Sequence, residues 1–238
     1  MAYSITGFVY LFAALSLVFL SIRFYQNWQR EKTVISKGFF WFASLFCLFF
    51  LVTAIGGLFF AQSPAVLKYI VVSVVFIQSS ASAILGYIIT YMKFPKTSPW
   101  LGFSIIFVSG IVATFIAALT TANPFLEPSG IINWNLGPAT EILRPLIFLS
   151  TIFPMGIILI RQGMVIQNRE AKIKAIGLGW AFLVGVVTGI IDFTLKSIFH
   201  LGAISTDISV LIFASSTFLL VIFTQNPPKQ EWVKMVGQ

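Results

Sequence analysis

Seven long apolar segments run through the 238-residue chain, and this pattern constrains its fold more than any other feature. The segments cover residues 4–22, 38–61, 66–92, 100–122, 142–160, 175–199 and 204–224. Each is close to the ~20 residues that a helix needs to cross a ~30 Å hydrocarbon core. They are apolar on every side, unlike the alternating strands of a membrane barrel. The sequence therefore predicts an all-α membrane protein, with a seven-transmembrane-helix domain over residues 1–225 and a short tail over 226–238.

The composition agrees with this fold class and excludes others. Hydrophobic residues make up 58% of the chain and charged residues 9%, whereas soluble domains carry about 25% charge. The net charge of +8 needs no nucleic-acid partner, because the basic residues flank the apolar segments, where anionic lipid headgroups lie. Cys47 and His200 are the only residues of their types. We therefore expect no metal or haem site, and the lipid bilayer is the expected partner.

Basic residues fall in every second gap between the segments, which predicts the orientation. Twelve of the 15 lie on one side: Arg23, Arg30, Lys32, Lys37, Lys93, Lys96, Arg161, Arg169, Lys172, Lys174, Lys229 and Lys234. The positive-inside rule makes that side cytoplasmic. We therefore expect a multi-pass protein of the plasma (inner) membrane of a bacterial-type cell, with its N-terminus outside and its C-terminus in the cytoplasm.

Ionisable residues gather at the predicted outer ends of the last three segments. They are Glu141, Arg144, Asp192, Lys196, His200 and Asp207. A lone charge inside a membrane helix costs about 2.5–3.5 kcal/mol on insertion scales, so such groups are usually paired or functional. Two interpretations follow: a salt-bridged rim that holds the helix ends together, with Asp192 paired to Lys196, or a polar vestibule that binds a small ligand or ion from outside.

The 66–92 segment adds a polar stripe near mid-membrane. Gln78 and Ser82 share one face of this helix, because residues four apart lie one above the other. The stripe could join helices by hydrogen bonds or form the polar floor of a central cavity. The long gap at 123–141 carries turn dipeptides together with Ile131, Ile132 and Trp134. It is predicted to be a non-helical loop that lies on the membrane surface as an anchor or covers the bundle mouth as a lid.

Small residues recur every four positions in the 175–199 segment, at Gly177, Ala181, Gly185 and Gly189. Such a stripe lets a second backbone approach closely. It predicts a tight crossing with a neighbouring helix, or with a homo-oligomer or signalling partner.

Two resemblances concern function. Asp192-Phe193-Thr194-Leu195-Lys196 resembles the retinal-binding helix of microbial rhodopsins, which would place a Schiff base on Lys196. That family carries its lysine in the last helix, so we expect no cofactor here.

Over residues 4–224 the chain resembles the seven-transmembrane sensor region of bacterial membrane histidine kinases. The similarity lies in helix number, topology, loop lengths and local texture, as in Lys37-Gly38-Phe39-Phe40-Trp41. The tail is too short for a kinase domain, so the resemblance implies a sensor that signals through a partner.

We therefore expect a non-enzymatic, receptor-like bundle that binds a small ligand in an outer vestibule. A small transporter or channel subunit is the first alternative and a membrane scaffold the second. Transport needs a continuous polar path, and the inner halves of the last three segments carry no ionisable residue, which favours the receptor.

Overall fold

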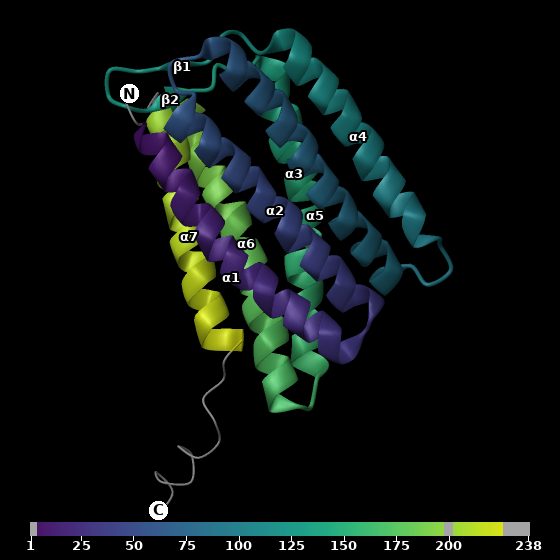
Figure 1. Cartoon of the computed structure of the whole chain (residues 1–238). Coiled ribbons are helices and arrows are strands. Elements are labelled where there is room, and N and C mark those ends of the chain that lie inside the picture. The colour runs from purple at the N-terminus through teal and green to yellow at the C-terminus, as the bar shows by residue number, and fades with distance from the viewer. Residues whose placement is uncertain (1–3, 198–201, 226–238) are drawn as a thin grey trace, which may run out of the picture.

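The computed structural model describes residues 4–197 and 202–225, which form seven α-helices and one short hairpin (Figure 1). The helices are α1 (Ile5–Glu31), α2 (Val34–Phe59), α3 (Pro64–Lys93), α4 (Pro99–Thr120), α5 (Pro138–Val165), α6 (Arg169–Ser197) and α7 (Ala203–Gln225). The strands β1 (Phe125–Leu126) and β2 (Ile132–Asn133) lie between α4 and α5. All seven helices are long and apolar enough to cross a membrane. The predicted all-α seven-helix bundle is confirmed.

Several helices extend beyond the predicted apolar segments, and α1 extends furthest at a single end. It continues to Glu31 instead of ending at residue 22, so only two residues separate it from α2. Apolar character marks the part of a helix inside the bilayer, whereas capping marks its end. Lys32 adopts a left-handed conformation (φ 54°) that ends α1. Thr33 then begins α2, its side chain accepting a hydrogen bond from the Ser36 N–H.

Six of the helices close into a ring. α1 packs against α2 and α7, α3 packs against α2 and α5, and α6 packs against α5 and α7. α4 lies outside this ring, against α3 and α5 (Figure 1). The contact between α1 and α7 joins the first and the last helix of the chain and closes the ring.

Alternate helices run in opposite directions, so the start of α1 and the end of α7 lie at opposite ends of the bundle (Figure 1). The hairpin lies at the end where α1 begins, which we call the hairpin end. The opposite end carries the short connections that follow α1, α3 and α5 and their basic residues, and we call it the basic end. The positive-inside prediction would place the basic end in the cytoplasm.

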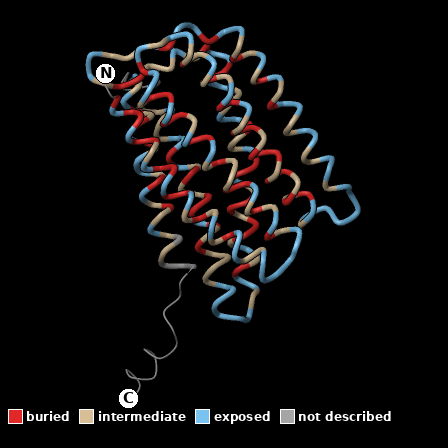
Figure 2. Tube along the Cα trace, viewed as in Figure 1, coloured by how far each residue is buried: buried red, intermediate tan, exposed pale blue. Residues whose placement is uncertain are grey.

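Buried residues line the inside of the bundle and exposed residues cover its outside (Figure 2). The centre is filled by phenylalanine. Phe46 alone contacts the rings of Phe42, Phe49, Phe50, Phe148 and Phe213, at centroid distances of 5.1–5.9 Å. Large apolar side chains such as Leu15, Phe115 and Leu119 point outward, as the surface of a membrane protein requires.

Glycines set the closest helix crossings. A Cβ on Gly57 of α2 would lie 2.7 Å from the Cα atom of Gly7 in α1, and a Cβ on Gly102 of α4 would lie 2.5 Å from the carbonyl oxygen of Gly86 in α3. Without a hydrophobic drive between helices in lipid, such close approach supplies the contact area that holds them together.

Candidate functional site

The hairpin covers the mouth of the bundle at the end where α1 begins. β1 and β2 pair antiparallel, with Phe125 opposite Asn133 and Leu126 opposite Ile132. Two hydrogen bonds fix this hairpin to the start of α1: the Ile5 N–H donates to the Gly130 carbonyl (2.7 Å), and the Ile132 N–H donates to Thr6 Oγ1 (3.0 Å). The hairpin is therefore joined to the bundle by its backbone.

Apolar side chains of β2 and its neighbours pack onto the protein, whereas Phe125 of β1 is exposed. Ile131 and Ile132 are buried, and the Trp134 ring stands edge-on to the Tyr10 ring at 6.3 Å. The burial of Ile131 and Ile132 contradicts the part of the membrane-anchor prediction that rests on these two residues. Trp134 is only half-buried, so the choice between an aromatic anchor and a lid stays a prediction.

Beneath the hairpin lies the acidic half of a polar cluster, built from α1, α6 and α7. Thr6 Oγ1 donates to Asp207 Oδ2 at 2.7 Å, and Asp207 is only 5% exposed. Ser205 Oγ donates to Asp192 Oδ1 at 2.9 Å. Thr6 thus links the hairpin, α1 and α7 through one hydroxyl, which accepts from Ile132 and donates to Asp207.

The basic half of the cluster is built from α3 and α5. Arg144 Nε donates to Gln78 Oε1 at 2.5 Å, and the guanidinium lies 5.4 Å from the centroid of the Phe49 ring. Tyr10 lies between the two halves, near Asp207, Arg144 and Asp192. Charged side chains from α5, α6 and α7 and polar side chains from α1 and α3 therefore meet beneath the hairpin.

The cluster rests on an aromatic floor. The Tyr10 ring packs on Phe49 and Phe50, at centroid distances of 6.5 and 5.7 Å. These phenylalanines continue into the central core around Phe46. Polar side chains therefore lie on the hairpin side of this layer, and apolar rings fill the bundle beyond it.

Not every predicted site residue joins the cluster. Arg144, Asp192 and Gln78 do, whereas the Glu141 side chain is exposed and Arg144 turns away from it to Gln78. Among the described side chains, no ion pair joins Glu141 to Arg144. Ser82 is fully buried on α3, and its hydroxyl has no hydrogen-bond partner among the described residues.

Two further predicted residues fall where the structure gives no side chain. Lys196 belongs to the last turn of α6, but the structure describes only its backbone. His200 lies outside the described residues. The predicted pairing of Lys196 with Asp192 stays a prediction.

The small-residue stripe of α6 packs over only part of its length. Gly177, Ala181 and Gly185 are buried, and a Cβ on Gly185 would lie 3.2 Å from the Phe213 ring of α7. Gly189 is exposed, and a Cβ added to it would have no neighbouring atom within 4 Å. The stripe therefore packs against side chains of α5 and α7 as far as Gly185. The close approach of a second backbone to α6 is found instead at Gly179, where an added Cβ would lie 2.9 Å from the Gly156 carbonyl oxygen of α5.

Sequence reasoning missed Thr6, Tyr10 and Ser205. Thr6 and Ser205 stand in the first turn of their helices, where a hydroxyl residue ordinarily serves as a cap. The one sequence feature that could have identified them is their position. They lie within one turn of the hairpin end, at the same depth as Asp207 and the predicted outer charges.

We expect the change Thr6→Val to lower the free energy of unfolding by about 2–3 kcal/mol, because it removes the two hydrogen bonds that the Thr6 hydroxyl makes with a buried carboxylate and with a backbone N–H. Chemical denaturation in detergent measures this. Thr53→Val is the matched control: Thr53 is equally buried, but its hydroxyl bonds only to the Phe49 carbonyl of its own helix. Equal losses in the two variants would contradict the bridging role of Thr6.

Comparison with protein-family models, with curated proteins and with solved structures gives no significant match to this chain.

Proposed function

We propose that the protein is a receptor-like membrane bundle that binds a small polar ligand or ion in the cluster beneath the hairpin and signals through a partner protein. One observation carries this proposal: Asp192, Asp207 and Arg144 come together inside a membrane bundle, joined to the partners Ser205, Thr6 and Gln78. Ionisable groups at such depth are costly and are ordinarily retained for function. The proposed ligand enters on the outside of the plasma membrane, where the hairpin acts as a lid.

The cluster suits a ligand that carries both polar and charged groups. Its carboxylates belong to α6 and α7 and its guanidinium to α5, so the site has a negative side and a positive side. A ligand that bridged them would change the spacing of these helices. Displacement of α6 or α7 is then a signal that a partner at the basic end could detect, as the resemblance to histidine-kinase sensor regions implies.

A transporter or channel subunit is the alternative, and the aromatic floor argues against it. Movement of a polar solute needs a polar path through the whole bundle. Below Arg144 and Tyr10 the centre is filled by Phe42, Phe46 and Phe182. A scaffold that binds nothing would leave the buried charges without a role beyond joining helices.

Cysteine labelling separates these three functions. In a Cys47→Ala background, which removes the only cysteine, Ser205→Cys places a thiol beside Asp192. A membrane-impermeant charged thiosulfonate is added to intact cells and to inverted vesicles. We expect labelling of Ser205→Cys from the outside only. Thr217→Cys is the control, because it is buried in the same helix, twelve residues or about 18 Å nearer the basic end, and should not react from either side.

Other outcomes contradict the proposal in distinct ways. Labelling of Ser205→Cys from both sides would indicate a continuous pathway and favour the transporter. Labelling only from the cytoplasmic side would reverse the predicted orientation. A thiol at 205 that never reacts would show that the cluster is sealed, which favours the scaffold.

A further inference from the structure

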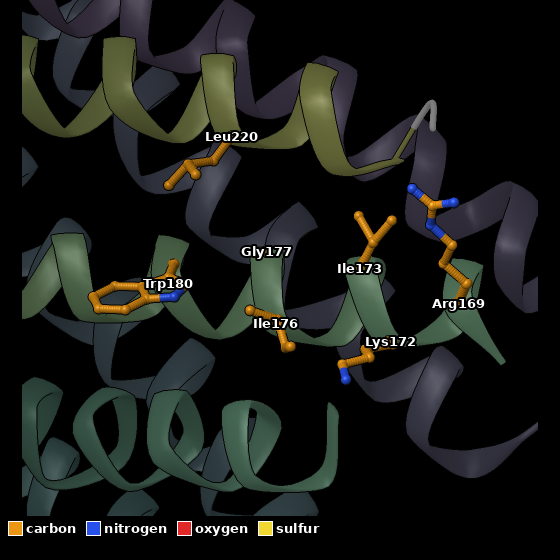
Figure 3. A pocket seen from close by; sticks show the side chains of 7 residues that line it. All are labelled: Arg169, Lys172, Ile173, Ile176, Gly177, Trp180 and Leu220. Carbon is orange, nitrogen blue, oxygen red and sulfur yellow. The ribbon is translucent and has the colours of Figure 1, made fainter. Parts of the chain in front are cut away.

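A groove opens at the other end of the molecule, between α6 and the end of α7. It has a volume of about 560 Å³ and is lined by Arg169, Lys172, Ile173, Ile176, Gly177, Trp180 and Leu220 (Figure 3). Arg169 and Ile173 project from α6 toward α7, and Lys172 projects from the other flank of α6. The groove is thus separate from the polar cluster, at the end of the bundle where basic residues gather.

The lining changes from charged to apolar along α6. Arg169 and Lys172 are exposed in its first turn. Within residues 4–197 and 202–225 the one ion pair is that of Lys174 with Glu170, 2.5 Å apart, so the carboxylate nearest to the groove is already engaged. Ile173, Ile176 and Trp180 follow. From Arg169 to Trp180 the helix rises about 16 Å, which is about the depth of one leaflet of the hydrocarbon core.

We propose that this groove is a selective binding site for an anionic phospholipid of the adjacent leaflet. Arg169, on the α7 side of α6, would hold the phosphate group as a donor that matches its oxygens, and Lys172, on the other flank, would add positive charge beside it. Ile173, Ile176 and Leu220 would line one acyl chain, with the exposed Trp180 ring against it. Basic pockets between transmembrane helices are sites where lipid headgroups bind, and here the cations stand above an apolar cleft.

Charge disfavours the nearest competing occupant, the tail that follows α7. Residues 226–238 carry Lys229 and Lys234 but only one acidic residue, Glu231. A basic segment and a basic groove mouth repel each other, whereas a phosphate complements both cations. A second copy of the chain would bring the same like charges together.

Native mass spectrometry of the full chain in detergent tests the proposal. The protein is mixed with equal amounts of phosphatidylglycerol and phosphatidylcholine of identical chains, and the bound lipids are compared. A basic residue near an anionic surface strengthens binding about fivefold, so two residues give a preference of up to about 30-fold for phosphatidylglycerol. We expect Arg169→Gln with Lys172→Gln to bring the ratio close to one.

The matched control is the double change Lys93→Gln with Lys96→Gln. It removes the same charge from the same end, at exposed positions outside the groove, and should keep the preference. The proposal is overturned if the wild-type chain binds both lipids equally or if the control loses as much preference as the groove variant.

A second measurement leaves Arg169 and Lys172 unchanged and follows tryptophan fluorescence. Phosphatidylglycerol with brominated chains should quench tryptophan fluorescence more than brominated phosphatidylcholine does, and Trp180→Phe should remove the difference. Equal quenching by the two lipids would count against a lipid in this groove.

Discussion

Replacing Arg144 with methionine is expected to lower the free energy of unfolding by about 3–5 kcal/mol. The guanidinium is the hydrogen-bond partner of Gln78 and interacts electrostatically with Tyr10 and Asp192. Without it, the carboxylates of the cluster lose a nearby positive charge, and the buried Gln78 side chain loses its donor. Removing one member of a buried charged group costs this much because the remaining charges stay out of water. Denaturation in detergent, followed by circular dichroism, measures the loss.

Two controls identify the source of the loss. Arg161→Met removes the same side chain from the exposed basic end of the same helix and should change stability by less than about 0.5 kcal/mol. In a double-mutant cycle, Arg144→Met combined with Gln78→Leu should cost less than the sum of the two single changes, because their hydrogen bond is lost only once. Additive losses would show that Arg144 and Gln78 do not interact.

The helices were predictable from the sequence because the bilayer sets their length. Each must bury its backbone polar groups over ~30 Å, so hydropathy marks it without knowledge of its neighbours. The same independence from neighbours explains why the helix ends were missed. Residues 23–31 are polar but still helical, and the end of α1 is decided by the left-handed Lys32 and not by hydropathy.

The polar cluster was predictable only in part. Arg144 and Asp192 stand out because ionisable residues are rare in apolar segments. Their partners depend on which helices become neighbours, and the ring closes by packing α1 against α7. That closure brings Thr6 to Asp207, residues 201 positions apart. No local pattern marks such a pair, and the i, i+3 spacing of Glu141 and Arg144 suggested a different one.

The close helix crossings show the same distinction. The regular stripe of α6 suggested tight packing through Gly189, whereas a close contact between two helix backbones at the hairpin end joins Gly7 and Gly57, which no repeat marks. A stripe of small residues indicates only that another helix can pack closely against this backbone. Which backbone approaches it depends on the arrangement of the whole bundle.

Replacing Gly57 with alanine is therefore expected to destabilise the protein by about 3 kcal/mol, near the upper end of the usual cost of overpacking. The added Cβ would lie 2.7 Å from Gly7 Cα and 2.9 Å from Ser4 Oγ. Ser4 Oγ also donates to the Gly57 carbonyl at 2.7 Å and accepts from the Gly7 N–H, so moving α1 aside breaks the cap of that helix. Thermal denaturation in detergent should show a lower melting temperature.

Two other glycines provide a graded comparison for the same substitution. At Gly56, the residue before Gly57, the nearest atom to an added Cβ is Ile70 Cδ1 at 2.6 Å. This atom is the end of a flexible side chain that can rotate away, so Gly56→Ala should cost less than Gly57→Ala. At Gly189 nothing lies within 4 Å, and alanine favours an exposed helix over glycine by about 1 kcal/mol, so Gly189→Ala should be neutral or stabilising. If Gly189→Ala costs as much as Gly57→Ala, contact between the α1 and α2 backbones is not what makes Gly57 sensitive, and α6 must meet a partner at Gly189.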